Sequence, residues 1–192
     1  MSTASWTFFQ AFLRSPKVVA SVIPSSPFLE RRLVNAARVS SAGSVVELGA
    51  GIGGTTRALL AAMTPQARLL AIERTAEFVP PLKDIGDSRL AVVNGCASRI
   101  VAELEQLGLA GADAVISGIP FSTLPPALSR IIAEEIARAL RPGGRFVAYQ
   151  FTDRVADFAT PVLGPPRIEH ELRNVPPLKV FTWTKPAATP TG

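Results

Sequence analysis

The stretch Val46-Glu-Leu-Gly-Ala-Gly-Ile-Gly-Gly-Thr55 decides the fold of this chain. It begins inside a short apolar run, 44–48, which predicts a buried strand, and it continues into a glycine-rich loop. Residues 55–63 then predict a helix that ends before Thr64-Pro65. The loop lacks side chains where a backbone must approach a ligand closely, at Gly49, Gly51 and Gly53. The stretch therefore predicts a strand, a ligand-binding loop and a helix in succession.

Short β-rich runs and helical segments alternate along most of the remaining chain. Strands are expected at 68–72, 90–93, 112–116 and 145–151, and helices at 75–84, 97–107 and 125–140. This alternation predicts an α/β fold with a doubly wound, mostly parallel sheet, whose ligands bind at the carboxyl ends of the strands. Only Pro176-Pro177 separates the runs 167–175 and 178–184, so these two are expected to form an antiparallel hairpin.

The composition indicates a globular protein of one domain. The chain has 192 residues, of which 47% are hydrophobic and only 18% are charged, which argues against disorder. A single cysteine, Cys96, excludes an intramolecular disulfide framework and favours a reducing cytoplasm, and a single histidine leaves no multi-histidine metal site. No run of about 18 apolar residues is present, so no transmembrane helix is expected. The N-terminal residues show no basic region, uninterrupted apolar core or small-residue cleavage site, so no signal peptide is expected either.

The net charge of +5 favours a polyanionic partner. Charge alone does not distinguish nucleic acid from an anionic membrane surface, and a solvated basic face without any partner is a third explanation. The segment 4–14 bears on this choice, because Trp6, Phe9 and other apolar side chains fall on one helical arc, with Arg14 and then Lys17 beside it. That pattern is typical of a helix in a membrane interface, although a helix packed on the protein's own core would look similar.

Glu47 helps to choose between two cofactors that could occupy the glycine loop. Read as Gly49-x-Gly51-x-x-Gly54 the loop is a dinucleotide fingerprint, and read as Glu47-x-Gly49-x-Gly51-x-Gly53 it is that of S-adenosylmethionine enzymes. A carboxylate at the end of an apolar strand needs a partner, which the cationic amino acid end of adenosylmethionine supplies and a pyrophosphate does not. Glu73 ends the second strand, where an acid can bind ribose hydroxyls or simply pair with Arg74.

These motifs resemble the Rossmann-like S-adenosylmethionine-dependent methyltransferases over about 44–184. The resemblance rests on the glycine loop, Glu73, the turn Leu140-Arg-Pro-Gly-Gly-Arg145 and the closing hairpin. It implies a mostly parallel seven-stranded sheet and places the cofactor on a set of residues from the front segment and the strand ends: Ser25, Ser26, Glu47, Gly49, Ala50, Gly51, Gly53, Glu73, Arg74, Cys96, Ala97 and Ser117. The family usually has an aspartate where this chain has Cys96, a weak acceptor, so one contact to the adenine is lost or moved.

The front of the chain is similar to the soluble bacterial phospholipid N-methyltransferases. The similarity lies in Ser15-Pro-Lys17, Val22-Ile-Pro-Ser-Ser-Pro27 and Ser117-Gly-Ile-Pro-Phe-Ser-Thr-Leu-Pro125. It implies methylation of phosphatidylethanolamine and its mono- and dimethyl forms toward phosphatidylcholine, by a monomer bound peripherally to the cytoplasmic face of the cell membrane. Residues 1–40 would contact the membrane and cover the site with helices, one of them running from an N-cap at Ser26 to about residue 38. Residues 41–185 would form the methyltransferase domain, and 186–192 a loose tail.

The substrate side is expected in the loop after the fourth strand and at the end of the fifth. Backbone carbonyls of Ser117, Gly118 and Ile119 can face the amine, whereas Phe121 and Tyr149 can face a methylated ammonium through cation–π contact. Methyl transfer would be an in-line displacement by the neutral amine, whose proton water could carry off. This reaction requires no acid–histidine dyad. Lipid contacts are assigned to Trp6, Phe9, Arg14, Lys17, Phe121, Tyr149 and Arg154.

Two other functions fit parts of the sequence. Adenine-N6 methyltransferases of RNA have a similar Pro-Phe pair after the fourth strand, but Ser117-Gly-Ile-Pro-Phe121 lacks their leading asparagine, so nucleic acid is not the expected partner. A membrane-surface binding module that has lost catalysis is the other alternative, and Cys96 is its support.

Overall fold

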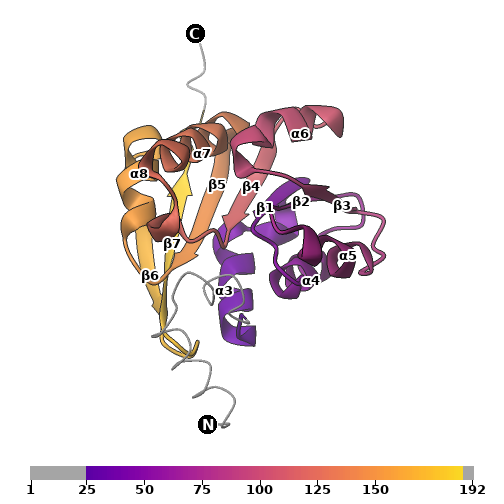
Figure 1. Cartoon of the computed structure of the whole chain (residues 1–192), viewed down its shortest axis with the longest axis horizontal. Coiled ribbons are helices and arrows are strands. Elements are labelled where there is room, and N and C mark those ends of the chain that lie inside the picture. Colours follow the sequence, from indigo (N-terminus) through magenta and orange to yellow (C-terminus); the bar gives the residue numbers. More distant parts are fainter. Residues whose placement is uncertain (1–24, 188–192) are drawn as a thin grey trace.

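The computed structural model describes residues 25–187 as an open seven-stranded sheet flanked by helices (Figure 1). The strand order is β3-β2-β1-β4-β5-β7-β6, in which β1 to β5 are parallel and β7 is antiparallel to both β5 and β6. The strands are β1 (Ser44–Leu48), β2 (Arg68–Glu73), β3 (Leu90–Asn94), β4 (Ala112–Ser117), β5 (Leu140–Gln150), β6 (Arg167–Glu171) and β7 (Leu178–Thr184). The predicted fold, including the closing hairpin, is confirmed.

Helices cover both faces of the sheet, because the side chains of the buried strands alternate between two cores. On one face lie α3 (Pro27–Ala37), α4 (Gly54–Ala62) and α5 (Val79–Lys83), and on the other lie α6 (Ile100–Gln106), α7 (Pro126–Ala139) and α8 (Arg154–Leu163) (Figure 1). Val45 packs with Leu29 and Leu33 of α3, whereas Val46 packs in the core under α7. Within 25–187, no helix has the length and apolarity that a membrane span needs.

One helix and two strand boundaries differ from what the sequence predicts. Helix α8 was not expected, because Pro161 lies inside it and obscures the helical spacing of Val155, Phe158 and Leu163. Pro142-Gly143-Gly144 does not break the chain before a strand; it lies in β5, which begins at Leu140 and contains a register shift opposite Ala112 and Ala114. Strand β6 ends at Glu171, so the turn to β7 is longer than two prolines.

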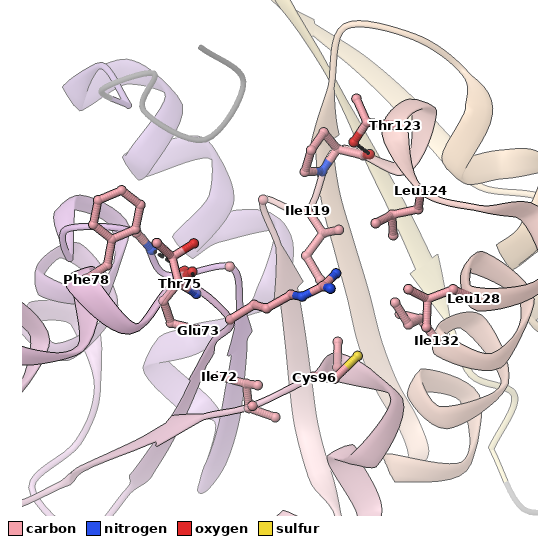
Figure 2. A pocket seen from close by; sticks show the side chains of 17 residues that line it. Ile72, Glu73, Thr75, Phe78, Cys96, Ile119, Thr123, Leu124, Leu128 and Ile132 are labelled. Atoms are coloured by element: carbon pink, nitrogen blue, oxygen red, sulfur yellow. Dashed lines mark hydrogen bonds between the residues drawn. The ribbon is translucent and has the colours of Figure 1, made fainter. Parts of the chain in front are cut away.

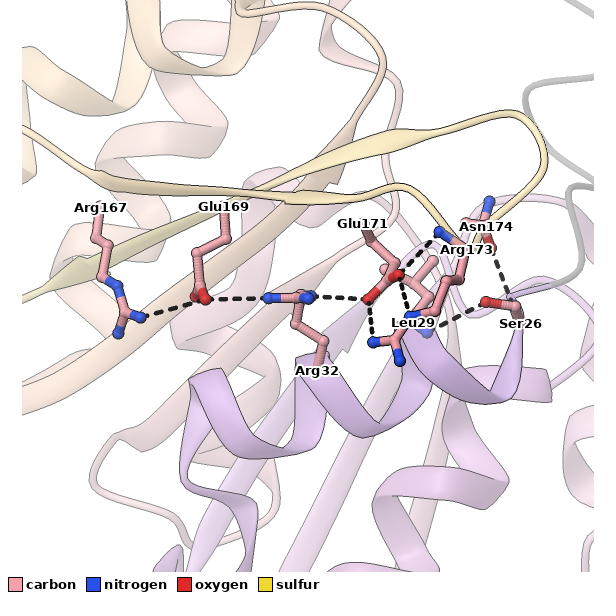
Figure 3. A network of polar contacts seen from close by, with 8 residues as sticks. All are labelled: Ser26, Leu29, Arg32, Arg167, Glu169, Glu171, Arg173 and Asn174. Atoms are coloured by element: carbon pink, nitrogen blue, oxygen red, sulfur yellow. Dashed lines mark hydrogen bonds and ion pairs between the residues drawn. The ribbon is translucent and has the colours of Figure 1, made fainter.

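A polar network joins α3 to the β6–β7 hairpin (Figure 3). Arg32 of α3 donates to Glu169 at 3.0 Å and to the buried Glu171 at 2.9 Å, and Glu171 also accepts from the backbone and side chain of Arg173. The hydrogen bond from the Arg173 side chain is the main reason that the pKa of Glu171 falls to about 2. Asn174 accepts from the backbone N–H of Ser26 at 3.0 Å. The network therefore fixes the start of α3 against the hairpin.

Glu171→Ala is expected to lower the free energy of unfolding by about 2 kcal/mol, because it removes a buried carboxylate that accepts hydrogen bonds from Arg32 and Arg173, although Arg32 keeps its ion pair with Glu169. Chemical denaturation of the variant measures the loss. Asp157→Ala is the control, because its ion pair with Arg154 is exposed and contributes less than about 1 kcal/mol. Equal effects of the two substitutions would show that the Glu171 network does not stabilise the fold.

Candidate active site

A cavity of about 220 Å³ opens at the carboxyl ends of the first four parallel strands. Its lining comes from the loops after β1, β2, β3 and β4 and from α7. Figure 2 shows Glu73, Thr75 and Phe78 on one side of the cavity, and Leu124, Leu128 and Ile132 on the other. The cavity is therefore polar at the end of β2 and apolar toward α7, at the edge of the sheet where a doubly wound fold binds its ligand.

Many of the residues assigned to the cofactor from the sequence come together in this cavity. They are Gly49, Gly51, Glu73, Arg74, Cys96 and Ala97. The proposed substrate residues Gly118 and Ile119 line it as well. The assigned residues thus meet at one edge of the sheet although they come from four different loops.

Glu73 presents a buried carboxylate to the cavity. It is 6% exposed, and its Oε2 accepts from the Gly51 backbone N–H at 2.9 Å while Oε1 accepts from Thr75 N–H at 2.8 Å. Asn94 donates to the Glu73 carbonyl and so connects the ends of β2 and β3. A carboxylate has about four acceptor sites, so two acceptor positions remain for the hydroxyls of a ribose.

Glu47 lies beneath the glycine loop and is 2% exposed. Its Oε2 accepts a hydrogen bond from the hydroxyl of Thr56 at 2.6 Å, where α4 begins. Burial raises the pKa of Glu47 to about 8, the Thr56 hydrogen bond opposes this rise, and the charge of Glu73 adds to it. Within the part of the chain described here, no basic side chain forms an ion pair with Glu47, so a ligand cation would relieve its desolvation.

Tyr149 approaches the backbone at Gly118 closely. A Cβ on Gly118 would clash with the Tyr149 hydroxyl and lie only 2.9 Å from its Cζ and 3.4 Å from the Gly49 carbonyl. Burial and the charge of Glu47 raise the pKa of Tyr149 to about 12, while neighbouring hydroxyls of Thr55 and Ser25 act in the opposite direction. The Tyr149 hydroxyl therefore stays protonated at ordinary pH and is able to donate a hydrogen bond.

Backbone groups after β4 are partly engaged within the protein. The buried hydroxyl of Ser117 accepts from Ile119 N–H at 3.2 Å, and the Ile119 carbonyl accepts from the Gln150 side chain at 2.7 Å. Gln150 is a residue that sequence reasoning missed, although it directly follows Tyr149 at the end of β5. It fixes the orientation of the Ile119 peptide, which was expected to face the amine.

Several assigned residues lie elsewhere. Ser26 caps α3 through its hydroxyl, and Ser25 is within 3.2 Å of the Thr55 hydroxyl. Ala50 packs with Leu82, and a Cβ on Gly53 would press on the same α5 side chain at 3.1 Å. These positions shape the loop from behind instead of lining the cavity.

Phe121 does not occupy the place expected for a lipid contact, whereas the contact assigned to the exposed Arg154 stays a prediction. Phe121 is 1% exposed and stacks on Phe158, so its ring lies in the core and not at a headgroup. Arg154 pairs with Asp157 on the outer side of α8. Trp6, Phe9, Arg14 and Lys17, and with them the expected interfacial helix, lie outside the described residues.

The cavity suits S-adenosylmethionine on several structural grounds. Glu73 offers free acceptor positions in the cavity. Glu47 does not line the cavity, but it lies at the end of β1 before the glycine loop, is buried, and has no cationic partner among residues 25–187. A side chain at Gly49 would meet Ile119 Cγ1 at 3.3 Å, which explains why this close approach uses glycine at a φ of +76°. Thr75, Phe78, Leu128 and Ile132 also line the cavity. No motif of the sequence distinguishes these four from ordinary core and loop residues.

Comparison with known proteins agrees with this geometry. Residues 46–148 match the methyltransferase domain family. An ornithine lipid N-methyltransferase of Singulisphaera acidiphila is 32% identical over 184 residues, which cover 91% of this chain and 92% of that enzyme. A ribosomal RNA small subunit methyltransferase A of Caulobacter vibrioides is 36% identical over 95 residues, but these are 48% of this chain and 34% of that enzyme.

Solved structures agree on the fold. The N-methyltransferase NodS of Bradyrhizobium japonicum WM9, in complex with S-adenosylhomocysteine, aligns with a TM-score of 0.59 at 14% identity, over 93% of this chain and 98% of that chain. An RNA methyltransferase of Salinibacter ruber aligns equally well, at 20% identity over 88% of this chain and 98% of that chain. At these identities the structures support the fold and not the substrate. From the family match and the full-length relative, the chain belongs to the methyltransferase domain family, and its methyl donor is S-adenosylmethionine.

Proposed function

We propose that the chain methylates the primary amine of a membrane lipid, and does so at the cytoplasmic face of the cell membrane. The observation that carries the proposal is the similarity to an ornithine lipid N-methyltransferase along almost the whole of both chains. Ornithine lipid is therefore the first substrate to test. Phosphatidylethanolamine, which the front motifs favour, is the second, and its methylation leads toward phosphatidylcholine. Both lipids present a primary amine at a membrane surface.

The side chains around the cavity suit transfer to a neutral amine. S-adenosylmethionine supplies an electrophilic methyl group when it is bound. Glu47 would accept from the amino group of the cofactor, and Glu73 from its ribose, which fixes the cofactor on either side of its sulfonium group. The Tyr149 hydroxyl, protonated at ordinary pH, would donate to an oxygen of the lipid headgroup. An apolar wall of Ile119, Leu124 and Leu128 disfavours the ammonium form of the substrate, whose proton leaves through water.

Methylation of RNA is a second candidate, favoured by the similarity to the Caulobacter ribosomal RNA enzyme over about half of this chain. The net charge of +5 suits RNA as well as an anionic membrane. A binding module without catalysis is the third possibility. It predicts that the full chain binds S-adenosylhomocysteine poorly or transfers no methyl group to any acceptor.

One assay tests these functions together. The full chain is incubated with radiolabelled S-adenosylmethionine and with three separate acceptors, namely micelles of ornithine lipid, micelles of phosphatidylethanolamine and total RNA. We expect label in a lipid fraction, with a preference between the two lipids, and none in RNA. Label confined to RNA would refute lipid methylation, and binding of S-adenosylhomocysteine without label in any fraction would favour the inactive module.

A further inference from the structure

An exposed apolar surface with arginines at its rim lies where α3 meets the β6–β7 turn. Phe28, Leu172 and Val175 are 37%, 71% and 49% exposed. Two guanidinium groups stand over the Phe28 ring, that of Arg173 at 4.3 Å and that of Arg31 at 5.0 Å from its centre. We call these five residues the hairpin–α3 surface.

The exposure of Leu172 and Val175 is built into the structure of the turn. Between them, Asn174 is 1% exposed, accepts from Ser26 N–H and donates to the Pro176 carbonyl at 2.9 Å. On the other side the buried Glu171 binds the backbone and side chain of Arg173 (Figure 3). The polar side chains of Glu171 and Asn174 are thus turned inward, while Leu172 and Val175 are turned outward, the reverse of the usual arrangement. The exposed Leu172 and Val175 do not stabilise the fold, which indicates that a partner covers them.

The charges of this surface favour an anionic partner. Arg31 is exposed and has no acidic partner among the described residues, and the Arg173 side chain is 60% exposed although it pairs with Glu171. Aliphatic side chains flanked by guanidinium groups suit the boundary between acyl chains and anionic headgroups. RNA would offer nothing to Leu172 and Val175, since neither can stack on a base.

The surface is continuous with the edge of the sheet that carries the cavity. Gln150 at the carboxyl end of β5 pairs with Lys179 of β7, so the β6–β7 turn lies at the same end of the sheet as the glycine loop. Ser25 contacts Thr55 at the start of α4, while the next residue, Ser26, contacts the turn. The start of α3 therefore bridges the cofactor loop and the hairpin.

We propose that the hairpin–α3 surface docks the protein on an anionic phospholipid bilayer and holds the cavity edge against it. The inference rests on the proposed function, because lipid substrates reach the cavity only from a membrane. Leu172 and Val175 would enter the acyl boundary, and Arg31 would contact headgroup phosphates. Phe28 and Arg31 lie within the segment 1–40 that was expected to contact the membrane, but Leu172, Arg173 and Val175 lie outside it, and none of the five is among the residues assigned to lipid from the sequence.

Sedimentation with vesicles tests the docking without any methyl transfer. The full-length double variant Leu172→Ser/Val175→Ser is expected to bind vesicles of phosphatidylglycerol and phosphatidylcholine about tenfold more weakly than the wild type. Arg31→Gln is expected to weaken binding about fivefold, and only on vesicles that contain phosphatidylglycerol. Matched controls are the double variant Leu107→Ser/Val162→Ser, at an exposed leucine that follows α6 and an exposed valine of α8, and Arg130→Gln on α7, which make the same kinds of substitution elsewhere on the surface.

The outcomes separate this proposal from the proposed function. Vesicle binding of the double variant within twofold of the wild type, at an unchanged unfolding temperature, would overturn the docking surface. A wild-type dimer that the double variant converts to a monomer in analytical ultracentrifugation would also overturn it, by assigning the surface to a second copy of the chain. A third outcome separates the two proposals: the double variant loses vesicle binding, but the wild type transfers no methyl group to lipid in micelles. That outcome would support the docking surface and refute lipid methylation.

Discussion

Gly118→Ala is expected to lower kcat for the proposed methyl transfer by about 100-fold or more. A Cβ at this position would overlap the Tyr149 hydroxyl and stand 2.9 Å from Tyr149 Cζ, so the tyrosine has to leave its place against the glycine turns. The Tyr149 ring is part of a strand that is packed on both faces, and it cannot yield without disturbing the cavity edge. Steady-state kinetics with the lipid substrate in micelles measures the effect.

Gly54→Ala provides the matched control for this substitution. Gly54 is the first residue of α4, directly after the glycine-rich loop that follows β1, and a Cβ there would meet only Glu30 Oε1, at 3.9 Å, which is ordinary contact. We expect this variant to retain kcat within about threefold, because the added methyl group displaces nothing and alanine favours the helix that begins there.

A double-mutant cycle shows whether Gly118→Ala acts through Tyr149. Tyr149→Ala removes the ring that the new methyl group would strike, so adding Gly118→Ala to it should cost little further activity. Additive losses in kcat would show instead that the alanine acts on another part of the cavity.

Glu47→Gln is expected to weaken the binding of S-adenosylmethionine by about 100-fold, because it removes a buried carboxylate from the cationic end of the cofactor. The same loss is expected for S-adenosylhomocysteine, which has the same amino acid end. Isothermal titration calorimetry measures both. Glu103→Gln on α6 is the control, since its ion pair with Arg99 is long, at 4.0 Å, and lies outside the cavity lining. Unchanged affinity in the Glu47 variant would assign the cofactor to other residues.

The pH dependence of this binding follows from the pKa of Glu47. The pKa of Glu47 in the folded protein is about 8, which lies above the ordinary value of 4.5. Between pH 4.5 and about pH 8, the folded state therefore keeps a proton that the unfolded state has lost. Stability of the ligand-free protein should therefore decline as pH rises from about 4.5 to about 8. A ligand cation favours the carboxylate, so cofactor affinity should rise over the upper part of this range and level off above about pH 8. In the Glu47→Gln variant, both the stability and the cofactor affinity should vary less with pH over this range.

The sequence predicts the parallel sheet, the hairpin and most helices because these features depend on local periodicity and turn residues. Helix α8 is hidden by Pro161, and the bulge in β5 is hidden by Pro142-Gly143-Gly144, which reads as a simple break although it packs against β4. The position of Glu47 and Glu73 at the ends of neighbouring parallel strands is also predictable, because the period of the strands and the direction of the sheet fix it.

The details of the candidate site depend on packing between distant segments, which no local pattern records. Phe121 was expected to face the lipid, but its apolar ring is buried against Phe158 of the unexpected α8. Gln150 binds the Ile119 carbonyl across 31 positions of sequence, and nothing near either residue indicates that contact. The same is true of Tyr149 and Gly118, whose close approach appears only once β4 and β5 are paired.

The ion pairs between α3 and the hairpin also bear on the solubility of the protein. Strand β6 is an edge of the sheet, and an edge strand offers unpaired backbone groups to any other strand. Charged side chains alternate along it, at Arg167, Glu169 and Glu171, and Arg32 ties two of them to a helix. A foreign strand would have to bury these charges or displace the helix. The contacts that fix α3 thus also protect the protein against edge-to-edge aggregation.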